Sequence, residues 1–194
     1  MHAWAPFRRV RISSETSEGW AALAYRRLCF RGISLYEGER MKAQKDSFAC
    51  IGHAVSAVLV VATFVHVAVS WDTMPDSIPA HYGLDGTPDA WGGKGSTLVA
   101  PCAMLLIFGI FFIASRHPGS WNTGVNMTEE NRDAVYRVLG RLIASIEAVS
   151  ALWLAAVSFI QVEEVRQPWF LLPAMLILLI GALAFWIRRL YRLK

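Results

Sequence analysis

The sequence is poor in the residues from which metal and redox sites are usually built. It has three cysteines, Cys29, Cys50 and Cys102, with no C-x-x-C pair among them, and neither H-E-x-x-H nor H-x-x-x-H occurs. Zinc sites and redox-active dithiols need such spacings, so we expect no metal site. We interpret the cysteines as small apolar residues in helix packing.

Charge is also scarce, since Asp, Glu, Lys and Arg together make up 18% of the chain. No serine stands beside a general base, no inward pair of carboxylates stands out, and no glycine-rich phosphate loop is present. The patterns typical of hydrolases, glycosidases and nucleotide-binding enzymes are therefore missing. We expect a protein with no catalytic residues, no enzymatic activity and no cofactor.

What the sequence does have is four long apolar runs. Hydrophobic residues make up 55% of the chain, and its mean hydropathy is +0.38. About 20 apolar residues are needed to cross a hydrocarbon core of roughly 30 Å. The runs predict transmembrane helices at about 48–71, 97–115, 138–160 and 169–188. The expected fold class is therefore all-α: a polytopic membrane protein with a four-helix bundle of two hairpins.

The basic residues indicate how these helices are oriented. Of the 19 Lys and Arg, all but Lys94 and Arg166 lie before the first run, between the second and third, or after the fourth. The positive-inside rule therefore places both termini in the cytoplasm and residues 116–137 in a cytoplasmic linker. We expect a multi-pass protein of the cell membrane, with the lipid bilayer as its partner. Nucleic acid is not an expected partner, because the basic residues flank membrane ends and form no single stripe.

Residues 1–40 differ from the rest, being basic and lacking an apolar run long enough for a signal peptide. One interpretation is an amphipathic segment on the membrane surface. The alternative is an over-extended gene start, with translation beginning at Met41, because residues 37–40 back-translate to a purine-rich run like a ribosome-binding site. We treat 1–40 as an N-terminal extension and 41–194 as the membrane domain.

Two ionisable residues, His53 and Glu147, lie inside the predicted spans. Each is about five residues from the cytoplasmic start of its helix, and each has a serine three positions on, Ser56 and Ser150. An ionisable group costs on the order of 2–3 kcal/mol at the bilayer centre, and less toward the edge, so it usually finds a partner. Three alternatives remain open: Glu147 reaches cytoplasmic water or an arginine, the two form an interhelical structural pair, or they form an ion or proton site.

The loop at 72–96 is long for a membrane hairpin, and its prolines, glycines and aromatics favour an ordered cap on the outer membrane face. Four aspartates against Lys94 give it a charge of about −3. A structural plug over the bundle, recognition of an extracellular peptide, and a metal site built from His81 and the aspartates are the alternatives. A negative cap would favour a basic peptide.

Ten residues of this loop fit the pattern P-x-x-I-P-x-H-[aromatic]-x-x-x-G-x-P-D-x-[aromatic]-x-x-K. They are Pro75, Ile78, Pro79, His81, Tyr82, Gly86, Pro88, Asp89, Trp91 and Lys94. In this pattern the segment resembles the signature loop of the SdpI-type immunity proteins, a bacterial membrane family. The resemblance covers roughly residues 48–115, together with a similar linker at 126–132. It implies that these ten residues are the candidate recognition site.

SdpI-type proteins protect their producer from a secreted toxic peptide, and some hold a transcriptional repressor at the membrane. The resemblance therefore implies peptide sensing or immunity, with a secreted peptide outside and a small repressor inside as partners. This chain departs from the full immunity proteins, because it has four predicted helices where they have about six. The alternatives are a small transporter or ion-conducting module that uses His53 and Glu147, and an accessory subunit without a ligand of its own.

Overall fold

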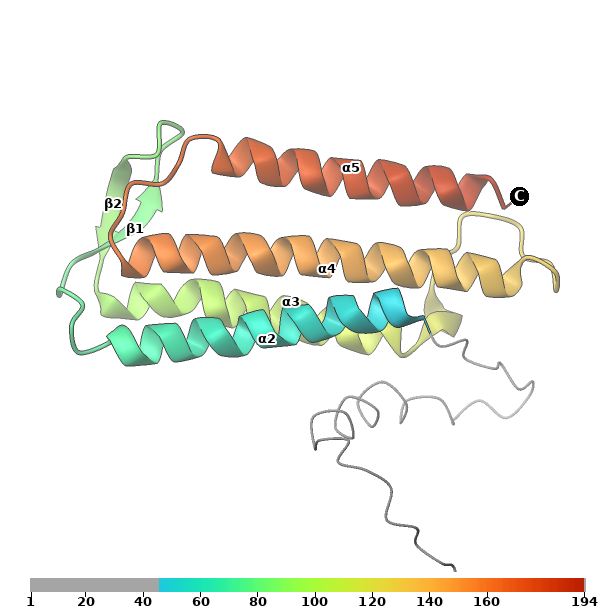
Figure 1. Cartoon of the computed structure of the whole chain (residues 1–194), viewed down its shortest axis with the longest axis horizontal. Coiled ribbons are helices and arrows are strands. Elements are labelled where there is room, and N and C mark those ends of the chain that lie inside the picture. The colour runs from blue at the N-terminus through green and yellow to red at the C-terminus, as the bar shows by residue number, and fades with distance from the viewer. Residues whose placement is uncertain (1–45, 194) are drawn as a thin grey trace, which may run out of the picture. The chain divides into compact units, whose positions relative to one another are not determined.

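The structure, a computed structural model, describes residues 46–193 and contains four helices long and apolar enough to cross a membrane. They are α2 (Ser47–Ser70), α3 (Val99–Ser115) together with the 3-10 helix η1 (Lys94–Leu98) that leads into it, α4 (Arg132–Val162) and α5 (Leu171–Tyr191) (Figure 1). The mainly helical architecture predicted from the four apolar runs is thus confirmed. The expectations about residues 1–40 and a start at Met41 lie outside the described residues.

Helix α4 is the centre of the bundle, since it packs against α2, α3 and α5. Figure 1 shows that α2 and α4 run in one direction and α3 and α5 in the other, so the chain forms two successive hairpins. Consequently, residues of α2 and α4 that lie far apart in the sequence come side by side along their whole length.

Within residues 46–193, the buried apolar residues form three separate clusters along the bundle and no single large core. One lies at the end of α2 and α4, one near the middle, and one where α4 meets α5 close to the C-terminus. Their buried members are Val67, Met74, Ile78 and Val162; Val60, Met104 and Ala151; and Val135, Val138, Leu139 and Leu190. Most of the remaining apolar side chains point outward, as expected for helices whose surroundings are lipid.

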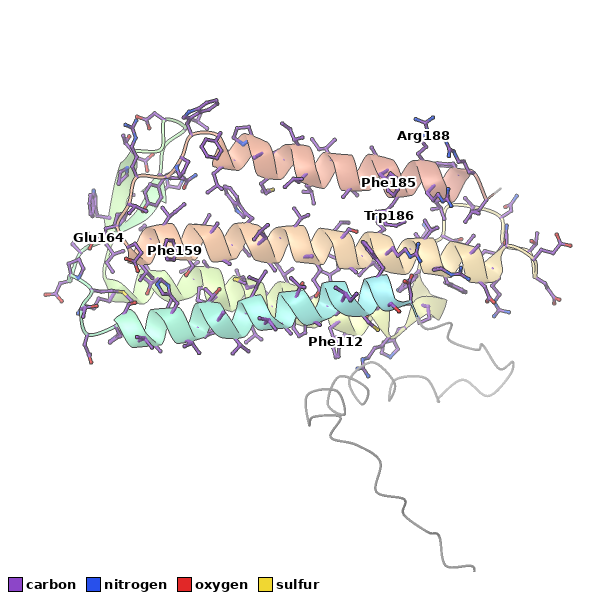
Figure 2. The ribbon with its side chains drawn as sticks, in the orientation of Figure 1. Phe112, Phe159, Glu164, Phe185, Trp186 and Arg188 are labelled. Atoms are coloured by element: carbon purple, nitrogen blue, oxygen red, sulfur yellow. The ribbon has the colours of Figure 1, made fainter. Side chains whose placement is uncertain are left out.

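Helix α5 is the least embedded of the four. Within Leu171–Tyr191, Leu190 is the single buried residue. Trp186 approaches α4, where its indole N–H donates to Ser145 Oγ at 2.9 Å (Figure 2). The helix is therefore held near its C-terminal end, and at its other end by the connection described below.

The linker between α3 and α4 is shorter than the predicted 116–137, because α4 begins at Arg132. A short 3-10 helix, η2 (Pro118–Ser120), follows α3. Thr128 and Asn131 then hold the turn just before α4, each side chain accepting a hydrogen bond from the other's backbone N–H. Asn131 also donates to the carbonyl of Leu193 at 3.1 Å, so the linker is joined to the end of the chain.

The loop between α2 and α3 is ordered, but it contains strands that the all-α prediction did not include. Strands β1 (Ile78–Tyr82) and β2 (Pro88–Gly92) pair antiparallel, and η1 (Lys94–Leu98) leads into α3. Each of these five-residue strands contains a proline, and their pairing is irregular in register. They show no alternating apolar pattern, so no strand was predicted here. We call residues 72–96 the cap.

Candidate functional site

The tip of the cap is a tight turn held by its own side chains. Gly83 N–H donates to the Thr87 carbonyl at 2.8 Å, and Gly86 N–H to the Gly83 carbonyl at 2.9 Å. Asp85 accepts from both the backbone N–H and the hydroxyl of Thr87. The hydroxyl and backbone hydrogen bonds from Thr87, with a smaller contribution from the charge of Arg166, lower the pKa of Asp85. The turn is therefore best ordered when Asp85 is ionised.

One side of the cap is buried against the ends of the helices. Ile78 is fully buried among Val67, Met74 and Val162. The carbonyl of the neighbouring Pro79 accepts a hydrogen bond from Gln161 Nε2 of α4 at 2.8 Å. These contacts join the β-hairpin of the first helical hairpin to the end of α4.

The tip of the cap also binds the connection between α4 and α5. Gln167 N–H donates to the Gly86 carbonyl at 3.1 Å, and an Arg166 guanidinium nitrogen donates to the Asp85 carbonyl at the same distance. Gly86 has a φ of +78°, and a Cβ placed on it would lie 1.9 Å from the Gln167 carbonyl oxygen. Glycine is therefore required here for two reasons, the positive φ and the close approach of a second backbone.

Tyr82 adds a further link to the second hairpin. Its hydroxyl donates to the Ile160 carbonyl at 3.5 Å, a long hydrogen bond. Partial burial, and to a smaller degree the negative charge of Glu164, raise the pKa of Tyr82. Figure 2 shows Glu164 at this end of the bundle. Tyr82 thus remains a neutral donor at physiological pH.

The other side of the cap is exposed. His81 of β1 pairs through Nδ1 with Asp89 Oδ1 of β2, and their side chains are 71% and 51% exposed. Trp91 and Leu84 are exposed apolar residues of the same hairpin. None of these four side chains belongs to the buried clusters. Packing therefore does not explain why a histidine, an aspartate and two large apolar residues occupy these positions.

The three remaining residues of the predicted recognition set lie at the base of the cap or within the strands. Lys94 donates to the Trp71 carbonyl at 3.4 Å and lies 3.9 Å from Asp76. Pro75 is exposed, and Pro88 is half-buried opposite Tyr82. Lys94 therefore closes the loop on itself, the bridging contact expected of a structural cap.

Within residues 46–193, no group of three or more His, Cys, Asp or Glu is placed to hold a metal ion. His81 meets Asp89 but no third ligand of these types, so the alternative of a metal site in the cap has no ligand set in this part of the chain.

Deep in the bundle, the structure brings His53 and Glu147 together. His53 Nδ1 of α2 lies 2.7 Å from Glu147 Oε2 of α4, and the Glu147 side chain is 1% exposed. Among the described residues, the second oxygen, Glu147 Oε1, has no hydrogen-bond partner. Glu147 therefore does not reach water, and the interhelical contact is the geometry present.

Two further side-chain pairs join the ends of α2 to the ends of α4, and neither pair was predicted from the sequence. Arg141 binds Asp46 at 2.7 Å near the start of α2, and His66 lies 3.1 Å from Glu163 near the cap. His66 also stacks on Phe159, with ring centroids 5.2 Å apart. Both pairs could have been predicted from two features of the sequence. The predicted topology makes the first and third helices run parallel, and both helices carry ionisable residues near each of their ends.

Residues 58–105 match a family described as a domain of unknown function, DUF1648. The matched segment runs from the middle of α2, through the whole cap, to the first turns of α3. It is about a quarter of the chain, and the description assigns no activity. The comparisons with curated proteins and with solved structures found no match.

Proposed function

We propose that this chain is a bacterial inner-membrane protein of the SdpI type, which senses a secreted cationic peptide or protects against it, without enzymatic activity. The match to DUF1648 supports this proposal, because SdpI-type proteins contain regions of that kind. The distribution of Lys and Arg supports an orientation with both termini in the cytoplasm and the cap outside.

The observation that carries the proposal is the exposed side of the cap, which combines negative charge with apolar side chains. The cap and the α4–α5 connection together hold six carboxylates and two cations. The residues are Asp72, Asp76, Asp85, Asp89, Glu163 and Glu164 against Lys94 and Arg166. Leu84, Trp91 and Trp169 are exposed among them. A cationic amphipathic peptide complements such a surface in both charge and apolarity.

A cavity of about 310 Å³ lies where the two hairpins meet, lined by Asp85, Arg166, Gln167, Pro168 and Trp169. It lies beside the hydrogen bonds that join Gly86 to Gln167 and Asp85 to Arg166. A basic side chain of the peptide that entered this cavity would compete with Arg166 for the cap. Binding would then shift the first hairpin against the second.

Such a shift reaches the opposite end of the bundle through α4 and α5. The linker before α4 is joined to the end of the chain by the hydrogen bond between Asn131 and Leu193. A movement of α5 relative to α4 would change which residues of this linker are accessible to a partner in the cytoplasm. The partner implied by the family resemblance is a small transcriptional repressor that binds there.

A direct test measures binding of a synthetic peptide of alternating Lys and Leu to the full chain in lipid nanodiscs of neutral lipid. A Glu and Leu peptide of equal length serves as the charge-reversed probe. We expect Asp89→Ala to weaken binding of the cationic peptide about 5- to 30-fold, as loss of one complementary charge in a small interface does. Glu129→Ala, an exposed acidic residue of the linker, is the matched control and should leave binding unchanged.

The corresponding cellular experiment compares survival of a peptide-sensitive host that expresses the wild type, His81→Ala or Asp89→Ala. Reduced protection at equal membrane abundance supports recognition by the cap. Equal protection by all three proteins would rule it out, and equal binding of both peptides in nanodiscs would show that charge plays no part.

A second candidate is a small transporter or ion-conducting module, favoured by the buried and incompletely satisfied Glu147. Ion flux across proteoliposomes that contain the wild type but not Glu147→Gln would support this alternative. No feature of the described residues favours an accessory subunit over these two functions.

A further inference from the structure

The buried pair between α2 and α4, His53 and Glu147, has a net charge that depends on how many protons it holds. Glu147 Oε2 meets His53 Nδ1, whereas Glu147 Oε1 has no hydrogen-bond partner among the described residues. A carboxylate at 1% exposure with one unsatisfied oxygen is costly if it carries a full negative charge. The net charge of the pair, which depends on the number of protons it holds, is therefore an energetic term in the contact between these two helices.

In addition to the ring N–H proton of a neutral imidazole, the pair must hold one further proton to be neutral overall. That proton lies either on the imidazole, giving an ion pair, or on Glu147 Oε2, giving a hydrogen bond between two neutral groups. Without it the pair carries one negative charge, and with a second proton it carries one positive charge. Both of these states place a net charge between apolar helices.

Other charged or titratable side chains on the packed elements do not replace this proton. Those toward the same end of the helices as the pair include Asp46, Cys50, Arg116, Arg132, Asp133, Tyr136, Arg137, Arg141, Arg188, Arg189 and Tyr191. Asp46 and Arg141 neutralise each other at 2.7 Å. Arg141 lies six residues before Glu147, about 9 Å along the helix axis. Arg116 stacks over Phe112, whose ring meets the ring of His53 in a T-shaped contact.

We propose that His53 and Glu147 form a proton-binding site within the membrane domain, which holds one proton and whose occupancy controls the contact of α2 with α4. A proton fits this site better than a metal cation, because the pair supplies two ligating groups and no third His, Cys, Asp or Glu joins them within residues 46–193. The proposal is independent of peptide binding, since neither residue lies in the cap.

The helices also provide a matched control. His66 and Glu163 join the same two helices at 3.1 Å, but their side chains are 29% and 45% exposed. Water can solvate this second pair in any protonation state. Glu163→Gln therefore removes the same chemical group from the same interface without changing a buried charge.

The test uses the full chain with ¹⁵N-labelled histidine in lipid nanodiscs, and the His53 signal is assigned by its loss in His53→Gln. We expect the wild-type signal to show the proton shared with Glu147, either as an imidazolium or as a neutral imidazole whose Nδ1 accepts a hydrogen bond from a protonated carboxyl group, and Glu147→Gln to remove that signature at the same pH. Glu163→Gln should leave it unchanged. Loss of the signature supports the proposal, and an unchanged His53 signal in Glu147→Gln overturns it.

Two further measurements on the wild type remain informative if Glu147→Gln fails to fold. Infrared difference spectra with ¹³C-labelled glutamate report whether Glu147 changes protonation when His53 does, and independent changes overturn the proposal. Replacing sodium with a large organic cation at constant pH should leave both spectra unchanged. A spectral change on this replacement would assign the site to a metal cation, and the proton proposal would fall while the peptide proposal would stand.

Discussion

The two sides of the cap differ in what their residues do, although the same ten-residue pattern supplies both. On the side facing the helices, Ile78, Pro79 and Gly86 are buried and bound to the second hairpin. On the opposite side, His81, Asp89 and Trp91 are exposed and contribute little to packing. A fixed pattern in a loop can therefore combine a structural set with a recognition set, and substitutions separate the two.

The largest effect is expected from Gly86→Ala. The new Cβ would meet the Gln167 carbonyl oxygen, and alanine at positive φ adds strain, so we expect a loss of more than ~3 kcal/mol in the contact between the hairpins. Hydrogen–deuterium exchange of the Gln167 amide measures it directly. Gly95→Ala, where a Cβ meets nothing within 4 Å, is the control and should change nothing.

Ile78→Ala should be the next most damaging, because it leaves a cavity in the cluster that anchors the cap. Truncating a buried isoleucine costs about 2–5 kcal/mol, part of which relaxation of the surrounding loop can recover. Thermal unfolding in nanodiscs, with exchange of the cap amides, gives the size of the effect. Leu84→Ala, at an exposed position of the same hairpin, should lower the midpoint little. An equal loss in both variants would show that the cap has no buried side.

Gln161→Ala should have an intermediate effect, since it removes the donor to the Pro79 carbonyl and leaves a buried acceptor unsatisfied. Such a loss costs about 1–3 kcal/mol. Faster exchange of the cap amides, without a change in the rest of the bundle, is the expected result. Gln167→Ala is a suitable comparison, because the contact of Gln167 with the cap is made by its backbone.

The turn at the tip of the cap should weaken in acid. The pKa of Asp85 is lowered in the folded state, so its stabilising contribution is present at neutral pH and is lost as pH falls below about 4. Asp85→Asn should abolish this dependence in amide exchange of residues 83–87. A tip that opens equally in both proteins on acidification would mean that Asp85 is not the responsible group.

The smallest effect on stability is expected from His81→Ala and Asp89→Ala. An exposed ion pair contributes about 0.2–1 kcal/mol, and both side chains lie largely in solvent. Each variant should therefore unfold close to the wild-type midpoint while binding the peptide more weakly. A large loss of stability in either would move the pair from the recognition side to the structural side.

The sequence predicted the helical part of the fold well because the requirement is local. Roughly 20 consecutive apolar residues are needed to cross a bilayer, and each run satisfies this by itself. The β-hairpin was missed because two five-residue strands with prolines carry no periodic signal. The start of α4 at Arg132 was missed because its first turns are polar and lie outside the apolar run.

The candidate sites likewise have some features that are local in the sequence and others that depend on contacts between distant segments. The sequence placed His53 and Glu147 at similar depths, yet it could not decide among three surroundings for Glu147. Their 2.7 Å contact depends on α2 and α4 lying side by side, a relation between segments 94 positions apart. Likewise, Gly86 was recognised as part of a pattern, whereas its reason, the backbone of Gln167, comes from the other hairpin.

The amino-acid order by itself determined the four apolar spans, the loop pattern and the scarcity of ligating groups, since each depends on residues close together in the chain. Only the tertiary structure decided which side of the cap is buried and that the first hairpin is bound to the second. It alone also decided which oxygen of Glu147 has no hydrogen-bond partner within residues 46–193. Those properties arise from packing between distant segments, where burial and hydrogen-bond geometry depend on all the neighbours at once.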